Sequence, residues 1–284
     1  MKLPAFDYAA PATLREALDL LAANPGAKAL AGGQSLIPTM AFRLATPPLL
    51  IDLAHLRELE KIAIDANGVH LGARVRWRDI EDHAALARAQ PLLVEAISHV
   101  AHYQVRNRGT IGGSLAHADP AAEMPGIAVT CDAQIVVNGA RGPRTIAAAD
   151  FFTGALSTAL RDDELIVEVR LPGWPANRRW AFEEFARRRG DFALAGIAAY
   201  YDLDANGRAA NTHIGVIGAC TRPRRVKAAE SAVNGHALTE KTIQAAARAL
   251  EGALDDAPTD LHASAAYRRS LAGALLERAL TRTL

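Results

Sequence analysis

Two glycine-rich segments carry residue types that can bind phosphate groups through the main chain. Residues 31–35 read AGGQS, and residues 110–114 read TIGGS. Glycine adopts positive φ at little cost and leaves room for a ligand close to the backbone, and successive N–H groups in such turns form a concave anion-binding nest. Ser35, Thr110 and Ser114 would add hydroxyl donors. On spacing alone, a diphosphate site and two plain turns are equally good interpretations.

Other common nucleotide and hydrolase motifs are missing from the sequence. Neither glycine segment has the spacing of the dinucleotide fingerprint G-x-G-x-x-G or of the P-loop. A nicotinamide dinucleotide in a doubly wound domain is therefore disfavoured. The sequence also has no G-x-S-x-G elbow, so nothing local supports serine hydrolysis.

Acidic, imidazole and basic side chains stand near these segments. Asp119 and Glu123 are four residues apart, which on a helix start would point both to one side. They either stabilise the helix dipole or accept hydrogen bonds from ribose or ribitol hydroxyls. His117 is interpreted as a polar contact rather than a base. The run from Arg187 to Arg189 is interpreted from the residues alone as a solvated face.

Composition excludes several classes of protein. The chain has 284 residues, with 32 Lys and Arg against 31 Asp and Glu, so it lacks the basic excess of a nucleic-acid binder. Cys131 and Cys220 are too few for a zinc site, an iron–sulfur cluster or a disulfide scaffold. We expect both to be buried. With no signal core and no run of 18 apolar residues, we expect a cytoplasmic chain without a membrane span.

Local patterns predict the elements that must position these residues. Thr13 and Glu16 form a capping box for a helix expected over residues 11–24. A strand at 28–30 enters the first glycine segment, after which a short helix begins. A hairpin turns at Asn67-Gly68. Further helices are expected at 77–89 and 92–100, and further strands at 49–53, 134–138 and 165–171. The second glycine segment is too rich in glycine for a regular element.

The sequence PGWP at 172–175 is the expected domain boundary. Strands follow at 180–185, 195–202 and 212–218, and helices at 227–233, 240–254 and 263–280. The fold class is therefore α+β, with a C-terminal domain of three antiparallel strands packed by helices.

The motifs together resemble those of one known family. AGGQSLIP at 31–38 resembles the pattern A-G-G-x-S-L-(I/L)-P, and RGTIGGS at 108–114 resembles (R/M)-G-T-I-G-G-(N/S). Asp119-Pro120 and Gly190-Asp191-Phe192 are similar to family segments as well. Over nearly its whole length the chain resembles the FAD-binding medium subunit of the molybdenum hydroxylases, the xanthine oxidase and carbon monoxide dehydrogenase family.

This resemblance implies a fold and a set of cofactor contacts. The implied fold is a two-subdomain FAD-binding domain of the PCMH type over residues 1–175, divided into 1–56 and 57–175, followed by a C-terminal domain over 176–284. Glu184 stands where the carbon monoxide enzyme's subunit has Lys, which leaves the flavin's basic partner open among the arginines at 187–189. The implied FAD-binding residues are Ala31, Gly32, Gly33, Gln34, Ser35, Leu36, Ala101, Val105, Gly109, Thr110, Gly112, Gly113, Ser114, Asp119, Glu123, Leu165, Arg188 and Phe192.

The resemblance also implies a role in a larger complex. Electrons would pass from two [2Fe-2S] clusters of a small subunit to this FAD and then to an external acceptor, while a large molybdenum subunit hydroxylates the substrate. The implied assembly is a dimer of heterotrimers. A stand-alone flavin oxidoreductase of the same superfamily is the alternative, and a scaffold that has lost its cofactor is a further one. The substrate is left open among N-heterocycles, aldehydes and carbon monoxide.

Overall fold

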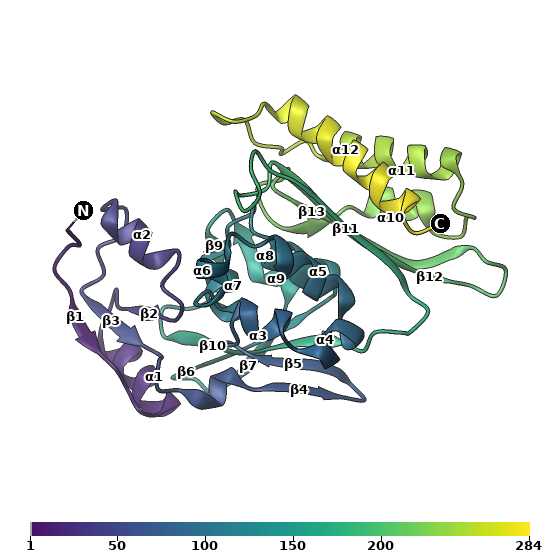
Figure 1. Ribbon diagram of the computed structural model, residues 1–284. Helices are drawn as coiled ribbons and strands as arrows, with labels where there is room; N and C mark the ends of the chain where they lie inside the picture. Colours follow the sequence, from purple (N-terminus) through teal and green to yellow (C-terminus); the bar gives the residue numbers. More distant parts are fainter. Residues whose placement is uncertain (1) are drawn as a thin grey trace.

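A small lobe of parallel strands forms the N-terminal end of the molecule. The computed structural model describes residues 2–284, and Figure 1 shows this lobe at one side of the chain. Its sheet has the order β1-β3-β2, and both neighbouring pairs run parallel. The elements of the lobe are β1 (Asp7–Ala9), α1 (Leu14–Ala23), β2 (Lys28–Leu30), α2 (Leu36–Ala41) and β3 (Leu49–Asp52).

An antiparallel five-stranded sheet, with the helices that cover it, forms the central part of the molecule. Its order is β4-β5-β10-β6-β7, and helices cover one face of it (Figure 1). The strands are β4 (Ile62–Asp65), β5 (Gly68–Gly72), β6 (Gln134–Gly139), β7 (Arg144–Ala147) and β10 (Glu164–Pro172). The helices are α3 (Trp77–Glu81), α4 (Ala84–Ala89), α5 (Pro91–His99), α6 (Tyr103–Arg106), α7 (Ile111–His117), α8 (Glu123–Thr130) and α9 (Ala148–Phe151). A 3-10 turn, η1 (Arg57–Glu60), and a short hairpin of β8 (Phe152–Gly154) and β9 (Ser157–Thr158) complete this part.

A second antiparallel sheet forms the C-terminal part and is covered on both faces. Its order is β11-β12-β13-β14. Figure 1 shows it between the helices of the central part and three C-terminal helices. The strands are β11 (Arg179–Phe185), β12 (Ala195–Leu203), β13 (Ala209–Ile217) and β14 (Arg224–Arg225). The helices are α10 (Lys227–Val233), α11 (Glu240–Ala253) and α12 (Ala265–Thr281).

The two faces of this second sheet belong to different hydrophobic cores. Phe182, Ala198 and Tyr200 are buried with the helices of the central part. Their neighbours in sequence, such as Ile197 and Ala199, are buried with the C-terminal helices. Side chains of a strand alternate between faces, so β11, β12 and β13 each contribute to both cores.

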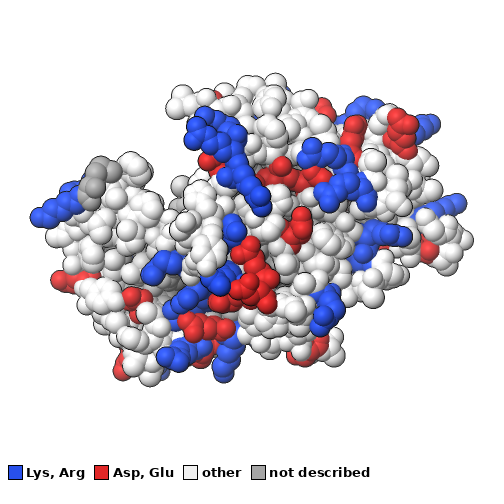
Figure 2. Space-filling model, in the orientation of Figure 1, with Lys and Arg blue, Asp and Glu red and all other residues white. Residues whose placement is uncertain are grey.

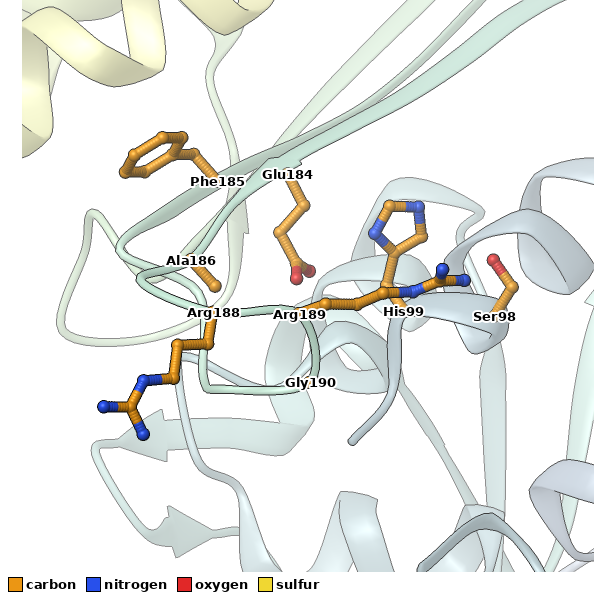
Figure 3. A pocket seen from close by; sticks show the side chains of 8 residues that line it. All are labelled: Ser98, His99, Glu184, Phe185, Ala186, Arg188, Arg189 and Gly190. Carbon is orange, nitrogen blue, oxygen red and sulfur yellow. The ribbon is translucent and has the colours of Figure 1, made fainter. Parts of the chain in front are cut away.

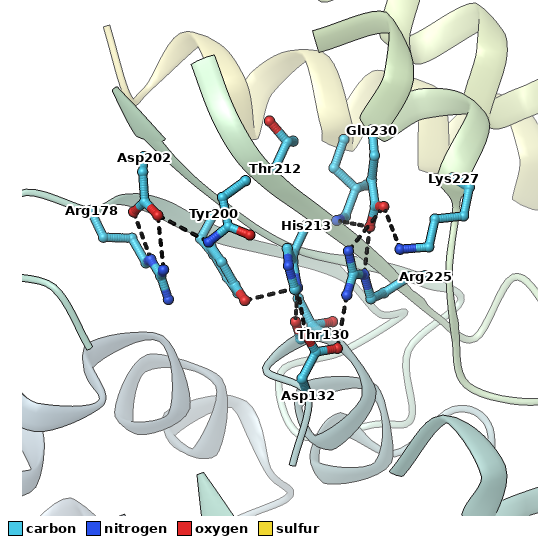
Figure 4. A network of polar contacts seen from close by, with 12 residues as sticks. Thr130, Asp132, Arg178, Tyr200, Asp202, Thr212, His213, Arg225, Lys227 and Glu230 are labelled. Carbon is cyan, nitrogen blue, oxygen red and sulfur yellow. Dashed lines mark hydrogen bonds and ion pairs between the residues drawn. The ribbon is translucent and has the colours of Figure 1, made fainter. Parts of the chain in front are cut away.

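A polar network also joins the second sheet to the central part (Figure 4). The Nδ1 atom of His213 lies 2.8 Å from both the Tyr200 hydroxyl and the Thr130 carbonyl oxygen at the end of α8. Because a carbonyl only accepts, the imidazole donates to Thr130. Arg225 donates to Asp132, beyond the end of α8, at 2.8 Å. The sheet is thus fixed to α8 by specific hydrogen bonds as well as by packing.

The predicted α+β class is confirmed, with local differences. The helix expected over 77–89 is two helices, because the His83 side chain accepts from Leu86 N and starts α4 afresh. The second sheet has a fourth strand, the two-residue β14, in addition to the three expected. Both cysteines are buried, as expected. None of the helices within residues 2–284 combines the length and apolarity needed to cross a bilayer.

Candidate functional site

The first glycine segment leaves a row of main-chain N–H groups without acceptors. It connects β2 to α2, and Gly33 in its middle has φ +72°. Within residues 2–284, none of the amides of residues 32–36 donates a hydrogen bond. The Gln34 side chain instead turns back to the Gly32 carbonyl at 3.2 Å. Main-chain donors are rarely left unpaired unless water or a ligand takes them, so this segment is a ready anion nest.

The second glycine segment is a helix start, which corrects the expectation that it forms no regular element. Thr110 is the N-cap of α7, and its hydroxyl accepts from Gly113 N at 3.2 Å. Ile111 and Gly112 donate to main-chain carbonyls just beyond β5, at 3.0 and 2.9 Å. A Cβ on Gly112 would lie 2.6 Å from the Ala73 Cβ. Here glycine allows α7 to pack closely against the chain just beyond β5. The amides of Ile111, Gly112 and Gly113 already donate to acceptors within the protein.

The two segments touch each other through glycine. A Cβ on Gly32 would lie 2.1 Å from the Arg108 carbonyl oxygen, so only glycine permits this contact. A Cβ on Gly113 would approach the Ala31 Cβ at 3.9 Å. The hydroxyl of Ser114, one turn into α7, makes no hydrogen bond within residues 2–284 and is available to a ligand. The fold therefore joins two segments far apart in sequence into one cradle.

A second contact brings the predicted residues Ala101 and Arg188 into the same region. Gly190, in the β11–β12 turn, has φ +87°, and a Cβ there would lie 2.6 Å from the Ala101 carbonyl oxygen. Ala101 itself has φ 43°. From Ala101 the chain runs through α6 to Val105, whose carbonyl accepts from Gly109 N at 2.7 Å. The short helix α6 thus connects the β11–β12 turn to the glycine cradle.

A cavity of about 280 Å³ opens beside this turn (Figure 3). The Glu184 carboxylate and the Arg189 side chain extend into the space between α5 and the turn, as Figure 3 shows. The lining residues are Ser98 and His99 at the end of α5, and Glu184, Phe185, Ala186, Arg188, Arg189 and Gly190. Ser98 and His99 could not be identified from the sequence, because they belong to an ordinary helix pattern that carries no motif.

Glu184, which lines the cavity, and Glu123, at the start of α8, both have a raised pKa. Glu123 is only 6% exposed, and burial, followed by the charge of Asp119, raises its pKa to about 7. Burial, followed by the charge of Glu123, raises the pKa of Glu184 to about 8. Desolvation and like charge both disfavour the ionised form. Burial also lowers the pKa of His99, on the opposite wall.

Asp119 and Glu123 do not share a helix face, contrary to the spacing argument. Asp119 lies in the turn before α8, where its carboxylate accepts from Ala121 N at 2.9 Å. Glu123 is the first residue of α8, and every residue of that helix is buried. The side chains are close enough for their charges to interact, but they belong to different local structures.

The remaining predicted residues lie around the site in different environments. Leu165 is buried in the hydrophobic cluster of the N-terminal lobe and does not line the cavity. Phe192 lies in the β11–β12 turn and is 63% exposed. Arg187 does not line the cavity and donates to His262 at 2.8 Å, which leaves Arg188 and Arg189 as the basic groups at the cavity. His117 closes α7 and is partly buried.

Family models match nearly the entire chain. Residues 4–174 match the model described as the FAD binding domain in molybdopterin dehydrogenase. Residues 180–283 match the model described as the CO dehydrogenase flavoprotein C-terminal domain. FAD is therefore the cofactor of this chain.

Relatives and solved structures agree with this assignment. The nicotine 6-hydroxylase medium subunit of Paenarthrobacter nicotinovorans is 40% identical over 99% of this chain and 98% of its own length. The carbon monoxide dehydrogenase medium chain of Hydrogenophaga pseudoflava is 36% identical over 98% and 96%.

Among solved structures, carbon monoxide dehydrogenase from H. pseudoflava lacking the Mo-pyranopterin moiety superposes with a TM-score of 0.96 at 37% identity, covering 100% of this chain and 98% of that one. Quinoline 2-oxidoreductase from Pseudomonas putida 86 gives 0.95 at 39% identity, covering 100% and 98%. The chain thus belongs to the FAD-binding medium subunits of the molybdenum hydroxylase family of oxidoreductases.

Proposed function

We propose that this chain carries electrons through FAD between a partner's [2Fe-2S] clusters and an external acceptor. In this proposal a large molybdenum subunit hydroxylates a small substrate, such as an N-heterocycle, an aldehyde or carbon monoxide, and this chain takes no part in that step. The names of the relatives, which are medium subunits of hydroxylases and dehydrogenases, support the proposal. The observation that carries it is the row of unengaged amides at 32–36 against the start of α7.

The glycine cradle fits the diphosphate of FAD. A diphosphate needs several converging donors and close approach of the main chain, and both are present in the first segment. The second segment packs against Gly32 of the first segment and adds the hydroxyl of Ser114. The residues assigned to this part are Ala31, Gly32, Gly33, Gln34, Ser35, Leu36, Gly109, Thr110, Gly112, Gly113 and Ser114.

The isoalloxazine ring would lie toward the cavity at the β11–β12 turn. Bound flavin supplies the capacity to accept and release electrons, and the protein orients the ring and tunes its electrostatics. Ala101 and Val105 would contact the ring or its chain along α6, while Arg188 would supply a positive charge and Phe192 would cover one ring face. Asp119 and Glu123 would face the polar groups of the cofactor, and Leu165 would support the first segment from the core.

The assembly follows from the same proposal. We expect a small [2Fe-2S] subunit and a large molybdenum subunit as partners, arranged as a dimer of heterotrimers. Figure 2 shows acidic and basic side chains interspersed on the face in view, which fits protein partners better than nucleic acid. The domain limits at 1–175 and 176–284 and the cytoplasmic location stay predictions.

Reconstitution and co-purification test the proposal. The purified chain, incubated with FAD and passed over a desalting column, should keep a flavin spectrum at close to one FAD per chain. A chain that keeps no flavin absorbance would contradict the cofactor site. Expression with the neighbouring genes should give a complex that contains molybdenum and iron, whereas a flavin-loaded chain that purifies alone and turns over its own substrate would favour the stand-alone oxidoreductase.

A further inference from the structure

The two glycine segments contain no charged side chain, although the group they would bind is an anion. AGGQS at 31–35 and TIGGS at 110–114 offer main-chain amides, hydroxyls and one carboxamide. Phosphate oxygens are bound most strongly by charged donors, and the guanidinium of arginine matches their geometry. An arginine beside the cradle would therefore add what the two segments lack.

The chain that leads from β5 into α3 carries three arginines, and only one of them has a guanidinium without a partner. Arg74 is buried and pairs with Glu60 at 3.0 Å. Arg78 pairs with Asp82 at 3.1 Å. Arg76 is exposed, and within residues 2–284 its guanidinium forms no ion pair and no hydrogen bond.

The main chain fixes the side on which Arg76 lies. Arg76 and Thr110 are opposite each other in an isolated antiparallel bridge. The hydrogen bonds of the bridge join the flanking residues, from Trp77 N to the Gly109 carbonyl and from Ile111 N to the Val75 carbonyl. In such a pair the two side chains point to the same face, with their Cβ atoms about 5 Å apart. The Arg76 side chain therefore starts beside the Thr110 side chain.

The other face of this bridge is the hydrophobic core. Val75, Trp77 and Ile111 are buried there. A Cβ on Gly109 would point to the same side, since it would lie 2.7 Å from Nε1 of Trp77. Because side chains alternate along an extended chain, the residues at 76 and 110 occupy the outer face.

The first glycine segment lies on the same outer side of the second segment. A Cβ on Gly113 would lie 2.8 Å from the Thr110 hydroxyl and 3.9 Å from the Ala31 Cβ. Ala31 begins the first segment, in which the amides at 32–36 donate no hydrogen bond within the described residues. Thr110 thus lies between Arg76 and the anion nest, and the long arginine side chain can extend across it.

The acidic side chain closest in sequence does not neutralise Arg76. Asp79 accepts from the main-chain N of Arg76 at 3.0 Å, but it forms no ion pair with the guanidinium within residues 2–284. Arg108, at the start of the second segment, is another exposed arginine without an ion pair in that range. Of the two, Arg76 is the one whose direction is defined by the bridge to Thr110.

We propose that the guanidinium of Arg76 binds a phosphate group of the FAD diphosphate from the Thr110 side of the cradle. The inference rests on the proposed function, because it takes the cradle to hold the diphosphate. The amides at 32–36 would contact the diphosphate on one side and Arg76 on the other. The free guanidinium, its pairing with Thr110 and the position of Ala31 on the same face carry the proposal.

The first experiment measures FAD affinity by fluorescence titration of the flavin-free chain. Arg76→Gln should weaken FAD binding roughly tenfold, the scale of one charge-assisted hydrogen bond. Arg76→Lys keeps the charge without the planar fork and should lose less. Equal FAD affinity in Arg76→Gln and the unmodified chain would overturn the proposal.

Arg88→Gln is the matched control. Arg88 is also exposed and without an ion pair within residues 2–284. It belongs to α4, which lies away from the N-terminal lobe (Figure 1). Its substitution removes the same charge, so FAD affinity should stay that of the unmodified chain.

The second experiment uses pyrophosphate, which has neither the flavin nor the adenine. Phosphorus NMR should show pyrophosphate binding to the unmodified flavin-free chain, and FAD should displace it. Arg76→Gln should bind pyrophosphate more weakly, and its binding should depend less on salt, because salt screens the charge that was removed. If Arg76→Gln weakened FAD binding but not pyrophosphate binding, the side chain would contact another part of FAD and the proposal would be wrong.

The two readouts separate the possible failures. A chain that binds pyrophosphate through Arg76 but takes up no FAD would overturn the proposed function and keep the anion site. A chain that binds neither would overturn both. A loss of FAD in Arg108→Gln without a loss in Arg76→Gln would overturn the assignment to Arg76. Thermal melting checks that each variant is folded, and the free side chain of Arg76 should be replaceable without loss of stability.

Discussion

Gly33 is the residue at which the shape of the anion nest is most easily disturbed. It has φ +72°, and a Cβ there would lie 3.2 and 3.3 Å from the side chains of Leu30 and Ile37. Valine avoids this conformation, so Gly33→Val would turn the peptide groups of the nest away from the diphosphate. We expect the variant to fold and to lose FAD, measured as the ratio of flavin to protein absorbance.

A matched control exists for this change. Gly207 has the same φ of +72° and nothing within 4 Å of its Cβ position, so Gly207→Val should carry similar backbone strain and keep its flavin. Gly113→Val should also lose FAD, since its Cβ would lie 2.8 Å from the Thr110 hydroxyl. Full flavin content in Gly33→Val would refute the assignment of the first segment, and in Gly113→Val that of the second.

Glu184 makes stability depend on pH in a defined direction. Its pKa is raised in the folded chain, so folding favours the protonated form. Stability is therefore lost as pH rises from the ordinary glutamate value to about 8. Glu184→Gln removes this loss, and above about pH 8 it should be more stable than the unmodified chain by on the order of 1–2 kcal/mol.

Thermal melting between about pH 5 and about pH 9 measures this difference. Glu277→Gln, on an exposed face of α12, should follow the unmodified chain throughout. If Glu184→Gln lost stability with pH as steeply as the unmodified chain, the carboxyl group would be ionised at neutral pH after all.

At the scale of elements, the N-cap of α7 supports the cradle. Thr110→Ala removes the hydroxyl that accepts from Gly113 N, and loss of such a cap costs about 1 kcal/mol. Thr239 caps α11 in the same way, by accepting from Thr242 N, but lies outside the site. We expect both alanine variants to lose similar stability and only Thr110→Ala to bind FAD more weakly, measured by flavin fluorescence titration. Equal FAD affinity in the two variants would show that the start of α7 does not contribute to binding.

The sequence predicted elements whose stability is local. The helix α1 has the predicted capping box between Thr13 and Glu16, and α10 spans the expected residues 227–233. The helix α7 was missed because two glycines lower helix propensity. Its cap and the close packing of Gly112 on Ala73 outweigh that cost.

The site was predictable only in part for a related reason. The glycine segments were visible because their motifs are contiguous, but the partner of Glu123 was predicted from spacing as Asp119. In the structure the charge of Glu123 also acts on Glu184, about sixty residues away in the sequence, and raises its pKa. Such contacts depend on tertiary packing, which periodicity does not reveal.

At the scale of the whole molecule, Arg225 on the second sheet forms ion pairs both with Asp132 of the central part and with Glu230 of α10. Arg225 contacts Asp132 at 2.8 Å and Glu230 at 2.6 Å, and the side chain of Glu230 is 4% exposed. Arg225→Met would leave that carboxylate with Lys227 as its remaining cation. Breaking a buried pair is costly, and we expect a loss of about 2–3 kcal/mol in denaturant unfolding.

Arg15→Met is the control for this prediction. Its pair with Asp19 is exposed on both sides, so its removal should change stability by less than about 1 kcal/mol. A loss of the same size in both variants would mean that Arg225 stabilises no more than a surface pair does.

The second sheet is buried on both faces, and this limits where residues can be inserted into or deleted from the chain. Insertion of one residue into β12 would exchange its two sets of side chains, so Ala198 and Tyr200 would face the C-terminal helices and Ile197 the central part. A strand in this sheet therefore cannot gain or lose a single residue without exchanging its two faces. Insertions and deletions must fall in the turns instead. The turn at 204–207 is open to them because its glycine meets nothing, whereas the turn at 186–192 is closed because Gly190 touches Ala101. Changes in length are therefore tolerated at the β12–β13 end of β12 and excluded at its β11–β12 end.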